Sequence, residues 1–396
     1  MDPDAADLTS IALVTSAAVA SGMLFSNLRQ PAIVGYVLAG IALGPSGLAL
    51  IKNSGNVETL AELGVLMLLF IVGAELSVRS FVSVMGVALS CALLQIGLSL
   101  TVAYGFGAYL GWPPAQIVLT GFLVSLSSTA VAIKMLEETG ELHTDVGRLT
   151  VGTLVAQDLA VVPMLLLVPV LGGKAAFDYV VMAKLGGAIS ILVGAIWLMG
   201  RRGQFELPLS VWFKADADMQ PMAVLAVCFS AATLSGLLGL MPAYGAFLAG
   251  LVLGNSNAQA GTLRVIKPIQ SVLMVVFFLS IGLLIDLQFI WRNLTTVLAL
   301  LAAVTLIKTV INIAALRVLG QKREVAFPAG VIMGQIGEFS FVLAAAGLAT
   351  RAFDRSGYRL AISVIALSLL ISPVWQLMAR RFHALEIGRA SCRERV

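Results

Sequence analysis

The chain has 396 residues, of which 59% are hydrophobic and 12% are charged, and its mean hydropathy is +0.98. A soluble domain carries about 25% charged residues, so this composition indicates a membrane protein and excludes an ordinary soluble enzyme. The formal net charge is only +4 and the basic residues fall mostly between apolar runs, so we expect no binding of nucleic acid.

About thirteen apolar runs, separated by polar breaks, are predicted to cross a lipid bilayer as helices. The acidic start of the chain, MDPDAADLTS, is unlike a signal peptide, so we expect the first run to be retained. We therefore expect an all-helical, multi-pass membrane protein. The runs lie near residues 8–26, 31–48, 58–77, 82–110, 114–137, 146–171, 179–199, 220–239, 241–254, 265–287, 289–318, 326–349 and 358–379.

The basic residues in the polar breaks predict the orientation of these runs. Cytoplasmic loops of membrane proteins carry an excess of lysine and arginine. Placing the N-terminus outside and the C-terminus in the cytoplasm puts thirteen of these basic residues on the cytoplasmic side and six on the opposite side, which include the cluster of Arg351, Arg355 and Arg359.

The fifth run, GFLVSLSSTAVAIKML, contains four hydroxyl side chains, Ser125, Ser127, Ser128 and Thr129. On a continuous helix, Ser125, Ser128 and Thr129 would share one face. Such a face is typical of an ion site, but also of hydroxyls that bond to their own helix or allow close helix packing. The run by itself leaves these alternatives open.

The sixth run contains LTVGTLVAQDLAVVPMLLLVPVL, in which Asp158 is the only ionisable side chain. A carboxylate near the middle of a bilayer costs several kcal/mol unless it is protonated, paired or bound to a cation, so it usually marks an ion pathway. The alternative is a protonated acid that is hydrogen-bonded inside a helix bundle. The preceding residue, Gln157, is neutral and limits the charge that the site can hold. Pro163 is predicted to leave the carbonyl of Leu159 without its helical partner.

Two later runs carry further polar side chains. Lys308 lies deep in TVLALLAAVTLIKTVINIAAL, so we expect it to meet a buried partner or a carbonyl of an unwound helix. The twelfth run, FPAGVIMGQIGEFSFVLAAAG, places Gln335 and Glu338 among glycines, which predicts local unwinding. The fifth and twelfth runs cross the membrane in opposite directions, which predicts inverted repeats with two interrupted helices that cross at the site.

Enzymatic readings of these residues find little support. A serine hydrolase needs a base beside its nucleophile, but the histidines, His143 and His383, lie outside the apolar runs. An aspartyl protease needs a second carboxyl facing Asp158, and Glu338 belongs to a different, glycine-rich motif. We expect a transporter without cofactors and without a metal beyond its transported cation. A gated potassium channel or a sensor that does not transport stays open, because no residue pattern separates these from an antiporter.

Several motifs together resemble the monovalent cation:proton antiporter-2 family. The motifs are SLSSTAVAIKMLEE, GRLTVGTLVAQDLAVVP, TLIKTV and GQIGEFSFVLAAAG, in this order, and FIVGAEL with Glu75 and FFLSIGLLIDL with Asp286 are similar as well. The resemblance covers residues 8 to 380. The pair Gln157–Asp158 resembles the Kef-type (KefC-like) potassium/proton branch, of which only the membrane domain is matched.

The resemblance implies a thirteen-helix fold of the sodium/proton antiporter type that forms a homodimer. The antiporter domain would occupy residues 1–385, with a mobile core at about 82–171 and 289–379 and a dimerisation domain at about 8–77 and 220–287. In that family, the aspartate that matches Asp158 exchanges the proton for the cation. The matching residues that assist it are Gln157, Ser125, Ser127, Ser128 and Thr129, and the residues that support the broken helices or form ion pairs are Lys308, Glu338 and Gln335.

We therefore expect a secondary active antiporter that exchanges potassium for a proton, electroneutrally, by alternating access at one buried aspartate, in a bacterial inner membrane. A sodium/proton antiporter or a gated potassium efflux channel is the alternative. Kef-type proteins continue into a nucleotide-binding regulatory domain, which we expect to be absent from this chain. The loop NSNAQAGTLRVIKPIQ has no acid, so gating by glutathione adducts is not expected. Residues 386–396 do not resemble the fold, and we expect a non-native tail.

Overall fold

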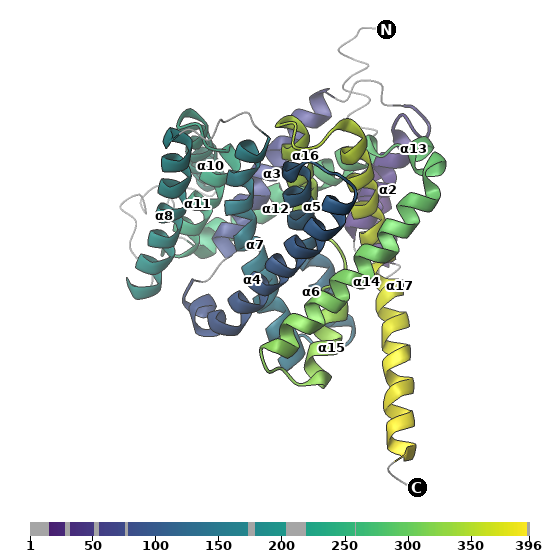
Figure 1. Ribbon diagram of the computed structural model, residues 1–396. Helices are drawn as coiled ribbons and strands as arrows, with labels where there is room; N and C mark the ends of the chain where they lie inside the picture. Colours follow the sequence, from purple (N-terminus) through teal and green to yellow (C-terminus); the bar gives the residue numbers. More distant parts are fainter. Residues whose placement is uncertain are drawn as a thin grey trace. The chain divides into compact units, whose positions relative to one another are not determined.

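The computed structural model describes residues 16–27, 32–50, 55–75, 78–172, 179–202, 219–257 and 259–393, and the regular elements in these ranges are helices (Figure 1). The predicted all-helical membrane fold is confirmed. The beginning of the first predicted run, residues 8–15, lies outside the described residues. The helices divide into two compact units, and one of the points at which the chain passes between them lies within a helix, between Gln157 and Asp158.

The first unit takes in residues up to Gly86, Asp158–Phe289 and Ala345–Arg355. Its central helix is α3 (Gly55–Glu75), which packs against α11 (Pro242–Gly254) and α12 (Gln259–Leu284), while α12 also packs against α2 (Ala32–Leu43). A side chain at Gly250 of α11 would run into the main chain of Phe70 on α3, so glycine permits this close approach. The unit also contains the helical residues 16–27 and the helices α8 (Tyr179–Arg202) and α10 (Met219–Leu237).

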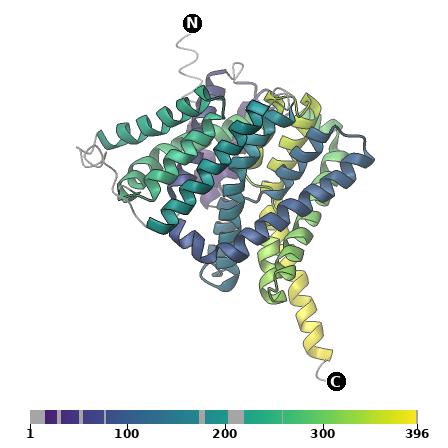
Figure 2. The same ribbon diagram turned by 60° about the vertical axis from the view of Figure 1, so that its left-hand side comes forward.

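The second unit takes in Val87–Gln157, Ile290–Ala344 and the chain from Ser356 onward. Its apolar core joins residues of α4 (Val78–Tyr109), α6 (Thr129–Glu138) and α7 (Asp145–Leu171) to residues of α14 (Leu294–Val318) and α15 (Arg323–Ile332). The green helices α14 and α15 lie side by side in both views (Figures 1 and 2). The remaining helices are α5 (Pro114–Ser125), α13 (Leu287–Arg292), α16 (Phe339–Ala349) and α17 (Arg355–Arg393). Of these, α13 and α16 are divided between the two units, and α17 has only its first residue in the first unit.

By length and hydropathy, six described helical segments could each cross a membrane. The apolar helices α5, α11 and α16 are shorter. The predicted fifth run is divided into α5 and α6, and the twelfth into α15 and α16, so neither is one continuous helix. The yellow helix α17 continues through Arg393 and so includes most of residues 386–396, the tail that we expected to be foreign to the fold (Figure 2). The six segments are Gly86–Tyr109, Asp145–Leu171, Met219–Leu237, Gly261–Leu283, Leu294–Val318 and Arg355–Ser372.

Candidate ion-binding site

The first interrupted helix breaks within the run of hydroxyls. Helix α5 ends at Ser125 and α6 begins at Thr129, and the backbone is extended at Leu126 and Ser128. The hydroxyl of Ser128 accepts a hydrogen bond from the backbone N–H of Val131 at 3.3 Å, which caps the start of α6. Because the helix is not continuous here, the prediction that Ser125, Ser128 and Thr129 share one helical face is wrong.

The second interrupted helix breaks where its glycines predicted unwinding, and this prediction is confirmed. Helix α15 ends at Ile332 and α16 begins at Phe339, and residues 333–338 between them are not helical. The backbone N–H of Ile336 in this gap donates to the hydroxyl of Ser368 on α17 at 2.9 Å. The side chain of Ser368 thus replaces a helical acceptor that the break has removed.

The two breaks lie against each other within the second unit. The N–H of Gly337 donates to the carbonyl of Leu126 at 3.0 Å, and the hydroxyl of Ser127 donates to the carbonyl of Met333 at 2.9 Å. The amide of Gln335 donates to the carbonyl of Ser128 at 3.3 Å. A Cβ atom at Gly337 would lie 2.6 Å from the carbonyl oxygen of Ser127, so only glycine fits there. The predicted crossing of two broken helices is confirmed.

One face of α14 supplies hydrogen bonds to both breaks. The Lys308 ammonium donates to the carbonyls of Val124 and Leu126, at 2.6 and 2.8 Å, at the end of α5. One turn later, the amide of Asn312 donates to the carbonyls of Gly330 and Met333, at 3.3 and 2.9 Å, at the end of α15. Both side chains are 1% exposed, so water does not compete for these carbonyls. Of the two alternatives for Lys308, these contacts match support of the broken helices.

Helix α7 reaches the first break through Gln157. The backbone N–H of Ser127 donates to Oε1 of Gln157 at 2.8 Å, and Nε2 of Gln157 donates to Oε1 of Gln95 on α4 at 2.7 Å. Both glutamine side chains are buried. Asp158 is the next residue of α7 and is itself buried, with 7% of its surface exposed. The carboxyl group therefore follows directly after the residue that fixes α7 to the break.

The three remaining predicted site residues lie at the ends of α5, α6 and α16. Ser125 is the last residue of α5, and its hydroxyl donates to the carbonyl of Phe122 in its own helix at 2.8 Å. This hydroxyl therefore follows the alternative of bonding to its own helix. Thr129 is the first residue of α6 and is half-buried, while Glu338 is buried directly before α16.

Sequence reasoning missed three residues that the breaks use. Gln95 and Asn312 are single amides inside apolar helices, and this isolation was the available signal for both. The third is Ser340 on α16, whose hydroxyl donates to the carbonyl of Leu123 at the end of α5 at 2.9 Å. A serine in an apolar helix is common, so its partner could be found only from the fold.

In the first unit, the two acids that belong to the family-like motifs have structural partners. Glu75, the last residue of α3, forms an ion pair of 2.8 Å with Lys267 on α12, and both side chains are about half exposed. A carboxylate oxygen of Asp286 accepts the backbone N–H of Phe289 at 2.9 Å at the start of α13. These contacts hold helix ends in place and give no sign of ion binding.

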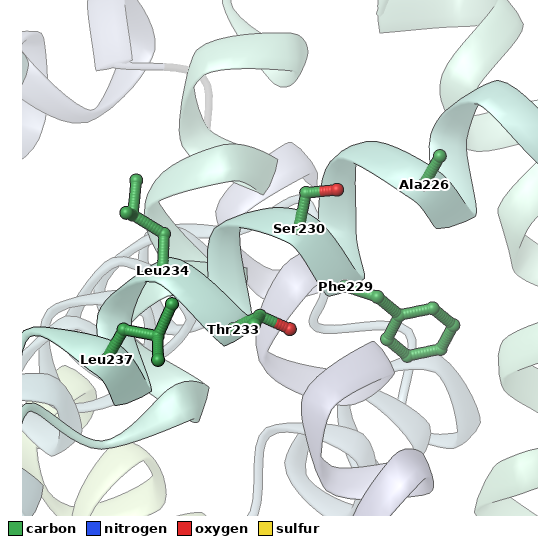
Figure 3. A pocket seen from close by; sticks show the side chains of 6 residues that line it. All are labelled: Ala226, Phe229, Ser230, Thr233, Leu234 and Leu237. Atoms are coloured by element: carbon green, nitrogen blue, oxygen red, sulfur yellow. The ribbon is translucent and has the colours of Figure 1, made fainter.

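A shallow hollow lies along α10 in the same unit (Figure 3). Its lining comes from one helix and contains two hydroxyls, of Ser230 and Thr233, but no charged side chain. We therefore do not assign the transported ion to it. The lining residues are Ala226, Phe229, Ser230, Thr233, Leu234 and Leu237.

Comparison with known proteins shows that the chain is similar to membrane transport proteins. Residues 13–377 match the family described as "Sodium/hydrogen exchanger, transmembrane". The chain is 47% identical over 377 residues to the "Iron transporter MagA" of Paramagnetospirillum magneticum, covering 95% of this chain and 86% of the relative. It is 33% identical over 371 residues to the "K(+) efflux antiporter 4" of Arabidopsis thaliana, covering 93% of this chain and 63% of the relative.

A third relative is the "Putative cation/proton antiporter YbaL" of Escherichia coli, with 29% identity over 377 residues, which are 92% of this chain and 66% of the relative. The chain thus spans slightly less than two thirds of the plant and Escherichia coli relatives. Among solved structures, the sodium proton antiporter MjNhaP1 from Methanocaldococcus jannaschii at pH 8 superimposes with a TM-score of 0.73. That alignment covers 94% of this chain and 98% of the other at 15% sequence identity, so it establishes the fold.

Proposed function

The chain belongs to the sodium/hydrogen exchanger family of membrane cation/proton antiporters, and we propose that it exchanges potassium for protons at Asp158. The observation that carries the proposal is the 2.8 Å hydrogen bond from the N–H of Ser127 to Gln157. This bond fixes α7 to the crossed breaks one residue before its buried carboxyl group. Unwound backbone at membrane depth is tolerated where it is buried in protein or lines a cavity, and transporter sites are typically built from such interrupted helices, two of which meet here.

The mechanism follows from one titrating carboxyl group. When ionised, Asp158 binds a dehydrated monovalent cation with help from neutral oxygens of Gln157 and of the hydroxyls and carbonyls at the first break. When protonated, Asp158 releases the cation, so proton and cation compete for one site. Alternating access then couples their opposite fluxes. Gln157 is neutral and both hydrogen bonds of Lys308 go to carbonyls, which supports exchange of one cation for one proton without net charge movement.

We assign the helices to moving and fixed parts as the family resemblance implies. The core at residues 82–171 and 289–379 would move, and residues 8–77 and 220–287 would hold a homodimer together. The N-terminus would lie outside a bacterial inner membrane and the C-terminus in the cytoplasm. The charge pattern of the loops supports this orientation.

Potassium is preferred over sodium because of the pair Gln157–Asp158 and because the plant relative is described as a potassium efflux antiporter. Iron(II) is a further candidate for the transported cation because another relative is described as an iron transporter. Iron(II) sites usually gather several imidazole or carboxylate ligands. One carboxylate among neutral oxygens is a better match for a monovalent cation, and within the described ranges no three His, Cys, Asp or Glu side chains gather as a metal site.

The test is proton movement in proteoliposomes that enclose a pH-sensitive dye, driven by an outward gradient of potassium, sodium or iron(II). We expect the potassium gradient to drive protons in the opposite direction, at a rate that does not respond to an imposed membrane potential. A transported net charge would couple at about 2.3 kcal/mol per 100 mV. Asp158→Asn should abolish exchange, whereas Asp145→Asn, at the exposed start of the same helix, should retain it.

Each other result would contradict a defined part of the proposal. Normal exchange by Asp158→Asn would remove Asp158 from the mechanism. Exchange with sodium or iron(II) but not with potassium would overturn the choice of cation. Potassium flux without proton movement would identify a channel. A steep response to potential would mean that a second group carries charge through the cycle.

A further inference from the structure

We propose that Gln95 is a positioning residue that locks the amide of Gln157 in one orientation and thereby sets the cation selectivity of the antiporter. The proposal rests on the function argued above. Gln95 lies inside α4, is 1% exposed, and has no other role in the mechanism. Its neighbours explain why an amide is needed at this position.

The orientation of both amides follows from one backbone group. The N–H of Ser127 can only donate, so the atom of Gln157 that faces it at 2.8 Å must be the oxygen Oε1. The nitrogen Nε2 of Gln157 then points the other way and needs an acceptor, which is Oε1 of Gln95 at 2.7 Å. This leaves Nε2 of Gln95 facing the weak acceptor Sδ of Met333 at 4.0 Å. The N–H at the break thus orients two amides in series.

The orientation of the Gln157 amide is restrained by the N–H of Ser127 and by Oε1 of Gln95, and without Gln95 only the first restraint would remain. Turning the Gln157 amide over would set its Nε2 against the N–H of Ser127, which places two donors together. With Gln95 present, the same turn would also set two acceptor oxygens together at 2.7 Å. A Gln157 whose Nε2 has no acceptor is free to tilt towards other partners, because a buried N–H without a partner is costly. Gln95 therefore stabilises the native orientation against both tilting and turning.

The position of the Gln157 oxygen is also tied to the second break. Beside the Gln95 amide, Met333 accepts hydrogen bonds at its carbonyl from the hydroxyl of Ser127 and the amide of Asn312, both at 2.9 Å. All five residues belong to the second compact unit. The oxygen Oε1 of Gln157 is therefore held from α4 and from both breaks, and its second lone pair can accept a cation.

A ligand oxygen held in this way discriminates between cations by size. Selectivity between similar ions depends on the dimensions of the site, the number of ligands and their flexibility. A fixed oxygen cannot follow a smaller ion inwards, whereas a loosened oxygen can. We therefore infer that loss of the Gln95 acceptor allows sodium to compete better with potassium and leaves the proton-binding carboxyl group in place.

The test compares Gln95→Met, which keeps a similar shape without the amide, with Gln95→Glu, which keeps an acceptor oxygen in either protonation state. The control is Ser99→Ala, one turn further along α4 and also buried. In proteoliposomes, the ratio of apparent KM for sodium to that for potassium should fall about tenfold towards one in Gln95→Met, as one lost hydrogen bond implies. The maximal rate should change by less than about threefold. Gln95→Glu and Ser99→Ala should keep the wild-type ratio.

The corresponding ratio of the dissociation constants for sodium and potassium should be measured without transport, from the thermal stabilisation of purified protein by sodium chloride and by potassium chloride. This second measurement separates the proposal from the proposed antiport, because it needs cation binding alone. An unchanged ratio in Gln95→Met, or an equal loss of discrimination in Gln95→Met and Gln95→Glu, would overturn the positioning role. If Gln95→Met does not fold, Gln95→Leu, which also lacks the acceptor oxygen, takes its place. The same fall in the ratio is expected there, and an unchanged ratio would again overturn the positioning role.

Discussion

Replacement of Asn312 by leucine should destabilise the protein by removing two hydrogen bonds at the end of α15. The amide of Asn312 donates to the carbonyls of Gly330 and Met333, at 3.3 and 2.9 Å. After the replacement, the carbonyl of Met333 still accepts the hydroxyl of Ser127, but the side-chain donor to Gly330 is lost. The two carbonyls are therefore affected to different degrees.

The magnitude follows from these two cases. A buried carbonyl left without a partner costs about 1–3 kcal/mol, and a lost bond to a carbonyl that keeps another partner costs about 0.5–1.5 kcal/mol. The sum is about 1.5–4.5 kcal/mol. Leucine offers little compensation, because lipid or detergent tails are as apolar as the protein interior. At about 2 °C per kcal/mol for a chain of this size, Tm should fall by about 3 to 9 °C.

The assay is thermal unfolding of purified protein in detergent at one fixed heating rate, since unfolding of such proteins is commonly irreversible. The control is Thr309→Val on the same helix, because the hydroxyl of Thr309 donates to the carbonyl of Thr305 in its own helix at 2.7 Å. That carbonyl keeps its helical partner, so the loss should stay below about 1 kcal/mol. An Asn312→Leu protein as stable as wild type, or no less stable than Thr309→Val, would refute the support of α15 by Asn312.

Two further substitutions test the crossing itself. Lys308→Gln should lower Tm at least as markedly as it slows exchange, because the shorter side chain loses at least one hydrogen bond to a carbonyl of α5 or the first break. The control, Lys267→Gln, should change Tm little, because it removes a half-exposed ion pair worth about 0–1 kcal/mol. Lost exchange at an unchanged Tm would instead place Lys308 in the ion cycle. Gly337→Ala should lower Tm and exchange together, because its Cβ would lie 2.6 Å from the carbonyl oxygen of Ser127, while Gly97→Ala has open space and should be neutral or slightly stabilising. Normal stability and exchange in Gly337→Ala would show that the breaks can separate at no cost.

The sequence predicted the second break better than the first, and the difference has a physical reason. Glycines weaken the helix between α15 and α16 by themselves, so the pattern in GQIGEF is visible locally. The first break contains Leu126 and Ser127 but no glycine or proline, and nothing local requires it to unwind. Its backbone groups instead find partners on distant helices, such as Gln157 for the N–H of Ser127 and Gly337 for the carbonyl of Leu126. Contacts of this range cannot be read from local patterns.

The buried polar residues show the same limit. Lys308 was identified because an ammonium inside an apolar run demands a partner, and its two carbonyl contacts match one of the expected alternatives. Gln95 and Asn312 are neutral amides in similar runs, and a neutral amide can be satisfied in many ways. Their importance comes from which carbonyls and amides the fold brings to them, so only the packing of α4 and α14 identifies them.

The two side chains of α14 that donate to the breaks, Lys308 and Asn312, differ in charge, so the electrostatic potential differs between the two breaks. Each half-helix that ends at a break exposes the negative pole of its backbone dipole, equivalent to about half an elementary charge. At the end of α5 that pole meets the amino group of Lys308, while at the end of α15 it meets the uncharged amide of Asn312. The ends of α5 and α15 therefore offer an approaching ion two different electrostatic environments whenever Lys308 carries its proton.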